Sequence, residues 1–145
     1  KKKNIFVVGN GGSAATASHF SSDLSINAKI KTINFNEYNL ITALSNDFGY
    51  EKWVEKSLEI YAKNGDLLIL ISCSGDSPNL VYANKIAIKK KIKVITLTGC
   101  SKTNKLNSNP SNTKIWINSK KYNVIEIVHH TILLTIIDNI INKSI

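Results

Sequence analysis

The sequence predicts an α/β fold, a three-layer sandwich in which a mostly parallel central sheet is flanked by helices on both faces. Short apolar runs that suit buried strands alternate along the chain with longer segments of helical spacing. The run 67–71 is apolar throughout, as expected for the centre of a parallel sheet. Two strand-like runs lead directly into loops rich in Gly or Ser. Ligands of such sheets bind beyond the carboxyl ends of the strands, so these loops indicate a site.

The first three elements follow from local pattern. Residues 5–8 form a short apolar run that ends at glycines, which predicts a buried strand. Residues 13–24 are rich in Ala and Ser and place Phe20 and Leu24 four apart, which favours a helix. Residues 31–35 alternate between polar and apolar side chains and predict a second strand.

The middle of the chain is expected to contain two helices before the central strand. Residues 39–45 predict a short helix and residues 46–50 a turn. Residues 51–62 carry apolar side chains at helical spacing, and the following Asn64-Gly65-Asp66 is typical of a helix end. The central strand at 67–71 comes next.

The last third is expected to add a helix, two strands and a final helix. Pro78 suits a first helical turn, so a helix is predicted from 78 to about 90. Strands are predicted at 93–98 and 114–117, with a polar loop over 101–113 between them. Residues 123–141 predict a long helix that is apolar on nearly every face and therefore needs cover from a missing segment or another subunit. We expect a homo-oligomer, a dimer or a tetramer.

Composition narrows the class of protein. The 145 residues suit a single domain, and no apolar run approaches the roughly 20 residues that cross a bilayer, so no membrane is expected. The net charge of +9 reflects 19 Lys, and the sequence has no Arg, the residue that favours base readout. A genome biased toward Lys and Asn explains this charge at least as well as binding to nucleic acid does. We therefore expect no nucleic-acid partner. Cys73 and Cys100 have no metal or disulfide spacing, which favours the cytoplasm.

The loop after the central strand predicts an anion site. Ser72, Ser74 and Ser77, with the backbone around Gly75, place hydroxyl and N–H groups at the start of the next helix, where the helix dipole favours negative charge. Because the loop has no Lys, it is not a nucleotide P-loop, and a phosphate monoester suits it better. The alternative is an ordinary strand–helix turn capped by serines.

The loop after the first strand has glycines but not the dinucleotide-binding spacing. Gly9-Asn10-Gly11-Gly12 lacks the third glycine of that pattern, and no acidic residue ends the second strand. The glycines instead allow a bound ligand to approach the backbone closely.

Three motifs resemble those of the phosphoheptose isomerases, the sedoheptulose 7-phosphate isomerases of the SIS (sugar isomerase) fold. They are Gly9–Ala15 with His19-Phe20-Ser-Ser-Asp23-Leu24, then Asn46-Asp-Phe-Gly-Tyr-Glu51, then Ile71–Asn79, in the family's order and spacing. The resemblance implies one SIS domain over residues 1–145, doubly wound and flavodoxin-like, apparently without the N-terminal helical segment of the family. Similarity weakens over residues 100–121 and resumes in the last helix.

The resemblance also implies site residues. Those expected to bind the sugar phosphate are Asn10, Gly11, Gly12, Ser13, Asn46, Asp47, Ser72, Cys73, Ser74 and Ser77. His19 matches a zinc ligand, and Asp23 stands where the family has a Glu that binds zinc and acts as acid–base group. A His and an acid at i and i+4 share one helix face, as a zinc site needs, although a packed His and a surface acid would look the same.

The last helix departs from the family pattern of a Gln, a His three residues on and a His eight residues on. Glu126 falls at the Gln and His129 at the middle His, but Leu134 replaces the final His. Zinc would then be held by His19, Asp23, Glu126 and either His129 or His130. The alternative is that His129 and His130 are polar spots on a buried interface helix.

The expected activity is aldose–ketose isomerisation of sedoheptulose 7-phosphate through an enediol, supplying heptose for a surface polysaccharide. Asp23 is expected to be the general base, with Glu126 and His129 as partners in proton transfer or metal binding. Because of Asp23 and Leu134, the alternative is a non-catalytic SIS module that binds a phosphosugar or, like a replication-initiator-associating relative, a protein partner.

Overall fold

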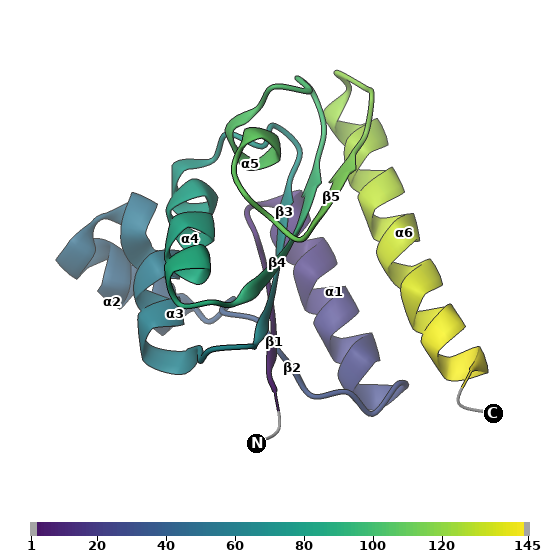
Figure 1. Ribbon diagram of the computed structural model, residues 1–145, viewed down its shortest axis with the longest axis horizontal. Helices are drawn as coiled ribbons and strands as arrows, with labels where there is room; N and C mark the ends of the chain where they lie inside the picture. The colour runs from purple at the N-terminus through teal and green to yellow at the C-terminus, as the bar shows by residue number, and fades with distance from the viewer. Residues whose placement is uncertain (1–2, 144–145) are drawn as a thin grey trace.

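The computed structural model describes residues 3–143 as one five-stranded sheet with helices on both faces (Figure 1). The strand order is β2-β1-β3-β4-β5, and every neighbouring pair is parallel. This confirms the predicted three-layer α/β fold. The elements are β1 (Ile5–Gly9), α1 (Gly12–Ile26), β2 (Thr32–Ile33), α2 (Tyr38–Phe48), a 3₁₀ turn η1 (Tyr50–Lys52), α3 (Trp53–Tyr61), β3 (Leu67–Ser72), α4 (Pro78–Lys89), β4 (Lys93–Thr98), α5 (Lys105–Ser108), β5 (Thr113–Trp116) and α6 (Tyr122–Asn142).

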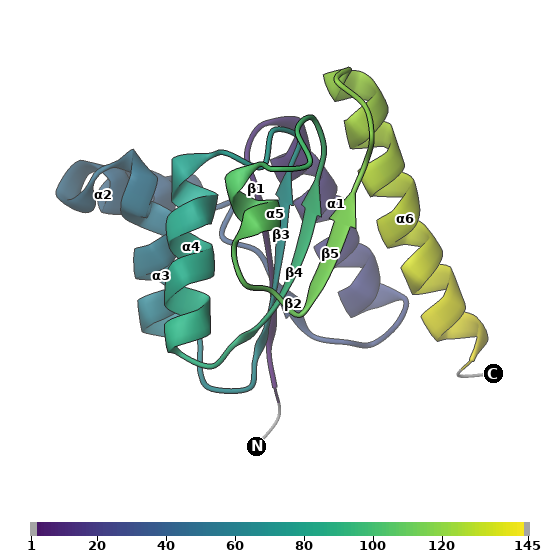
Figure 2. The ribbon, with the colours of Figure 1, turned by 45° about the horizontal axis from the view of Figure 1, so that its top comes forward.

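Each face of the sheet has its own apolar core. Helices α2, α3 and α4 lie on one side and α1 and α6 on the other, as the two views agree (Figures 1 and 2). Phe6, Leu68 and Trp53 belong to the first core, and Val7, Ile69 and Phe20 to the second. Adjacent strand residues therefore point to opposite cores, which explains why the central strands have no polar alternation.

The strand order places the ligand edge between β1 and β3. The chain leaves β1 through α1 on one face and leaves β3 through α4 on the other (Figure 1). Gly9 pairs with Ile71 in the register, so the two loops that follow these strands begin side by side. In doubly wound sheets such a reversal opens a crevice at the carboxyl ends of the strands.

Three predicted boundaries are wrong. Helix α2 runs through the predicted turn to Phe48 and ends where Gly49 adopts φ 89°. The predicted 101–113 loop contains a short helix, α5, whose first turn is capped by the Asn104 side chain at 2.8 Å from Asn107 N. The second strand pairs over only two residues because it lies at the edge of the sheet, beside β1 alone.

Helix α6 corrects one expectation of the sequence analysis. It is 21 residues long and, by length and composition, apolar enough to cross a membrane, contrary to the statement that no run approaches that length. Ile125, His129, Leu133 and Ile137 form its buried side, which faces the sheet and α1. Its other sides are half-buried or exposed, so residues 3–143 do not cover the whole helix.

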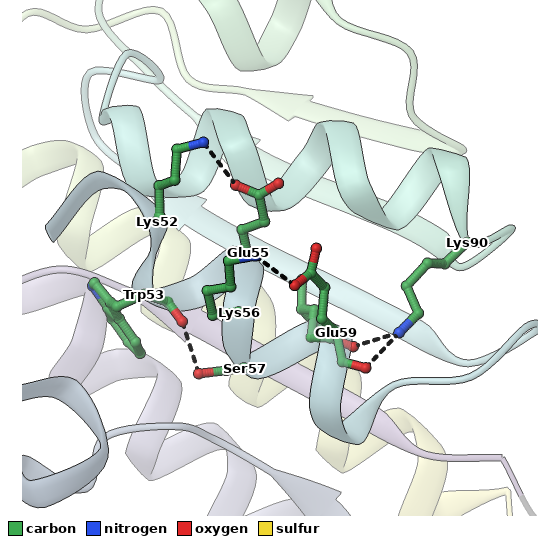
Figure 3. A network of polar contacts seen from close by, with 8 residues as sticks. Lys52, Trp53, Glu55, Lys56, Ser57, Glu59 and Lys90 are labelled. Atoms are coloured by element: carbon green, nitrogen blue, oxygen red, sulfur yellow. Dashed lines mark hydrogen bonds and ion pairs between the residues drawn. The ribbon is translucent and has the colours of Figure 1, made fainter. Parts of the chain in front are cut away.

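A polar network fastens α3 to the end of α4 (Figure 3). Lys90 Nζ donates to the carbonyl oxygens of Leu58 and Glu59, each at 2.9 Å. These carbonyls belong to the last turn of α3, where a positive charge is favoured. The exposed side of the same helix carries the Lys56–Glu59 ion pair at 2.8 Å, which raises the pKa of Lys56 through its hydrogen bond to Glu59.

Candidate functional site

A polar cavity of about 180 Å³ lies beyond the carboxyl ends of β1 and β3. Its lining residues come from both loops and from the start of α6: Asn10, Ser13, Ile71, Ser72, Cys73, Ser74, Ser77, Tyr122 and Glu126. A larger cavity of about 470 Å³ lies at the sheet edge around Ile33, Phe35 and Tyr61. We assign the site to the smaller cavity because hydroxyls, an amide and a carboxylate converge there, as expected of a pocket for a small polar ligand.

The serine loop, residues 72–77, is shaped by its own hydroxyls. Gly75 N donates to Ser72 Oγ at 3.1 Å, and Asp76 N donates to Ser74 Oγ at 3.2 Å. Gly75 has φ 71°, a conformation that favours glycine. Ser77 is the N-cap of α4, but its hydroxyl makes no capping bond and instead lies 3.4 Å from Ser72 Oγ in the cavity wall. The loop therefore places hydroxyls beside the N-terminus of α4, an arrangement that suits an anion.

The glycine loop lets α1 begin directly at the cavity. Gly11 has φ 53° and serves as the N-cap of α1 without a side-chain bond. A Cβ atom on Gly12 would lie 2.5 Å from Oε1 of Glu126, so only glycine lets this carboxylate rest against the first turn of α1. A negative charge is favoured at that end of a helix.

Glu126 joins α6 to the serine loop. The Cys73 thiol donates to Glu126 Oε1 over 3.8 Å, and its sulfur lies 4.0 Å from Ser13 Oγ. Burial raises the pKa of the Cys73 thiol to about 11; the hydrogen bond to Ser13 opposes this rise and the charge of Glu126 adds to it. Cys73 is therefore a neutral donor in the cavity wall.

A second cavity of about 230 Å³ lies on the other side of Glu126, between α1 and α6. Gly12, Thr16, Glu126, Ile127, His130 and Thr131 line it. His130 Nδ1 is 3.3 Å from Thr16 Oγ1, and its ring centroid is 4.9 Å from that of His19. His19 Nε2 in turn lies 3.3 Å from Asp23 Oδ2. The imidazoles of His130 and His19 and the carboxylate of Asp23 thus form a row that begins at this cavity and continues along α1.

His129 points the other way. It is fully buried, and its Nε2 donates to the Thr98 carbonyl at 3.2 Å. Burial lowers the pKa of His129, against smaller opposing effects from the Thr98 carbonyl and Glu126. Within the described chain, its Nδ1 has no hydrogen-bond partner. His129 is therefore a neutral imidazole against the sheet.

The structure gathers most of the predicted phosphate site but not the whole predicted set. Asn10, Ser13, Glu126 and the four serine-loop residues line the first cavity, while Gly11 and Gly12 form its glycine loop. Asn46 and Asp47 are exposed on α2 and line neither cavity of the described chain. His129 likewise lines neither cavity, and His19 and Asp23 lie beyond the second one.

Two aromatic residues at the site were not predicted. Tyr122 lines the first cavity from the start of α6, and Tyr50 donates from η1 to Asn10 Oδ1 at 3.4 Å. The position of Tyr122, four residues before Glu126, was a usable signal because i and i+4 side chains share a helix face.

The donors implied for zinc are only partly together. His19, Asp23 and His130 lie near one another, but Glu126 is turned toward Cys73. Within residues 3–143, no three His, Cys, Asp or Glu side chains surround a common point that could hold a metal ion. This arrangement of side chains does not fit the four-ligand site implied by the resemblance.

Comparison with known proteins identifies the family to which the chain belongs. Residues 1–99 match the SIS domain model. The phosphoheptose isomerase of Buchnera aphidicola subsp. Acyrthosiphon pisum (strain Tuc7) is 41% identical over 103 residues, which cover 68% of this chain and 53% of that protein. The chain thus spans about half the length of the curated relatives it matches.

Two solved structures resemble the chain over nearly its whole length. A phosphoheptose isomerase from Francisella tularensis superposes with a TM-score of 0.88 and 29% identity, covering 97% of this chain and 76% of that one. The enzyme of the same name from Neisseria gonorrhoeae gives a TM-score of 0.89 and 27% identity, covering 99% and 77%. The resemblance therefore includes α6 and the weakly similar segment before it.

Proposed function

The chain belongs to the SIS domain family, and from this premise we propose that it is a phosphosugar isomerase that interconverts sedoheptulose 7-phosphate and its aldoheptose isomer. The observation that carries the proposal is the position of Glu126, whose carboxylate shares one cavity with the serine loop. A phosphate gripped by that loop would leave the sugar carbons to extend toward a carboxylate. The similarity to phosphoheptose isomerases supports this choice of sugar.

The serine loop is the phosphate grip in this proposal. Ser72, Ser74 and Ser77 supply hydroxyls, and α4 begins directly behind them at Pro78. The partial positive charge of a helix N-terminus stabilises a phosphate without any Lys in the loop. Cys73, as a protonated thiol, adds no negative charge that would repel the ligand.

Glu126 is the proposed proton-transfer group. A base removes a proton from carbon 1 of the ketose while the oxygen on carbon 2 gains a proton, which gives the enediol. The oxygen on carbon 1 then loses its proton, and carbon 2 gains one, which gives the aldose. A carboxylate can carry the proton from carbon 1 to carbon 2 if both proton transfers take place on the same face of the enediol. Glu126 lines the cavity that contains the proposed phosphate grip, so one carboxylate can reach both neighbouring carbons.

The remaining catalytic assignments stay predictions. Asp23, the expected general base, is linked to the second cavity only through His19 and His130. His129, the expected partner, is buried against Thr98. Zinc also stays a prediction, and adding ZnCl₂ to the purified chain tests it. Binding by calorimetry that His19→Gln abolishes would support a zinc ion, whereas no heat would contradict it.

We also propose a homo-oligomer, a dimer or a tetramer, in the cytoplasm. Ile127 is 67% exposed on α6, and Val124 and Ile136 on the same helix are exposed as well. Exposed aliphatic side chains along one long helix favour a protein interface over water.

The test of the isomerase is deuterium incorporation. The protein is incubated with sedoheptulose 7-phosphate in D₂O, and proton NMR follows carbons 1 and 2. Exchange of a carbon-bound proton, together with an aldose signal, is expected because the enediol releases that proton. Binding without exchange would favour the non-catalytic SIS module, and neither exchange nor binding of any ketose phosphate would overturn the proposal.

A further inference from the structure

Two asparagines join the glycine loop to the first turn of α4. Asn10 Nδ2 donates to Asn79 Oδ1 at 2.9 Å, and Asn79 Nδ2 donates back to Asn10 Oδ1 at 2.9 Å. Asn79 is 1% exposed and does not line the cavity, whereas Asn10 does. A reciprocal amide pair of this kind fixes the orientation of both side chains.

The hydrogen-bond capacity of Asn10 is almost used up. Its Oδ1 accepts from Asn79 and also from the Tyr50 hydroxyl at 3.4 Å, which occupies both lone pairs. Its Nδ2 has two hydrogens, and Asn79 takes one of them. One N–H group is left, so Asn10 can offer the cavity a donor but no acceptor.

We infer that Asn79 is a positioning residue that holds the Asn10 amide so that this remaining N–H faces the ligand. The inference rests on the proposed phosphosugar site. An N–H donor beside the serine hydroxyls selects an oxygen acceptor on the ligand, a phosphate or sugar oxygen. Without Asn79, the Asn10 amide is free to rotate and to present its carbonyl oxygen, which repels a phosphate.

The chain provides a matched control on the same helix. Asn84 is also 1% exposed and lies in α4, but its amide atoms have no hydrogen-bond partner within the described residues, and it lines neither site cavity. Replacing Asn84 removes a buried amide from α4 without changing the glycine loop. Asn84→Ala therefore measures how removal of a buried amide from α4 affects binding when no bond to the glycine loop is lost.

The experiment is a double-substitution cycle read by calorimetry with sedoheptulose 7-phosphate as the probe. Asn10→Ala and Asn79→Ala are each expected to weaken binding roughly fivefold or more, the size of one hydrogen bond, and the double variant no further than Asn10→Ala alone. Asn84→Ala is expected to bind as the parent does. If Asn79→Ala does not fold, the nearly isosteric Asn79→Asp replaces it, because Asp offers no N–H to Asn10 Oδ1.

The outcomes separate the inference from the function on which it rests. Additive losses in the cycle, an Asn79 variant that binds like the parent, or equal weakening by Asn84→Ala would each overturn the positioning role alone. Failure of the parent to bind the probe would overturn the proposed function and the inference with it.

Discussion

Cys73 and Glu126 meet in the wall of the candidate site, with the thiol donating to Oε1 over 3.8 Å. One residue comes from the serine loop and the other from α6, 53 positions later in the chain. The contact joins the proposed phosphate grip to the proposed proton-transfer group. A substitution in one of them can therefore be tested for its effect on the other.

Glu126→Gln is expected to lower turnover of sedoheptulose 7-phosphate by roughly 10²–10⁴-fold, the usual contribution of a proton-transfer group. Binding should change little because the phosphate grip is intact. The measurement is the rate of aldose formation, with Glu59→Gln on the far side of the molecule as control. Turnover at the parent rate in Glu126→Gln would assign proton transfer to another group.

Cys73 is expected to resist alkylation. With a pKa of about 11, only about one thiol in a thousand is ionised at pH 8, and the thiolate is the reactive form. Iodoacetamide labelling followed by mass spectrometry of the peptides checks this, with Cys100, which is more exposed, as the internal comparison. Faster labelling at Cys73 than at Cys100 would contradict a protonated thiol.

His129 is expected to make the fold less stable in mild acid. Its pKa is lowered in the folded state, so the unfolded chain binds a proton more readily and stability falls as the pH drops below about 6.5. The contribution is complete above that pH and is lost toward the lowered folded-state pKa, at up to about 1.4 kcal/mol per pH unit.

Urea unfolding of the parent and of His129→Gln between pH 5 and pH 8 measures this effect. The difference between the two stability profiles should show the loss. Parallel profiles for the parent and His129→Gln would show that burial of this imidazole has no influence on stability.

Ile127→Glu is expected to break the proposed oligomer because it places a charge on the exposed apolar side of α6. Light scattering after size exclusion gives the mass. Ile60→Glu is the control, since Ile60 is 63% exposed against 67% for Ile127 but lies on α3, across the sheet. A monomeric parent at every concentration would rule out the oligomer, and equal effects of both substitutions would locate no interface on α6.

Much of the fold could be predicted because its strands are apolar on both faces. The pattern predicts the first strand at 5–8, and it runs to Gly9; it predicts the central strand at 67–71, and it runs to Ser72. The pattern predicts too early an end for helix α2 because Asn46 and Asp47 are common in turns, whereas the conformation of Gly49 sets the end. The sequence pattern does not reveal helix α5, because it has only four residues and a single apolar side chain, Leu106, cannot show an apolar period.

The site was predictable only where topology decides it. Parallel neighbouring strands bring the glycine and serine loops together. The alternation of strands and helices along the sequence predicts this arrangement. The orientation of His129 and His130 was not predictable, because α6 is apolar on most sides and its pattern does not show which side is buried. The Asn10–Asn79 pair also needed the structure, since 69 residues separate the two.

Consecutive imidazoles on α6 face different surroundings, one sealed against the sheet and one open to the cavity beside Glu126. Each residue of an α-helix advances about 100° around the axis. Inserting one residue between Ile127 and Val128 would therefore advance the following helix by one position relative to Glu126 and bring His129 to the place that His130 occupies at the cavity. The spacing of the acid and the two histidines, more than the identity of either histidine, decides which ring a ligand would meet.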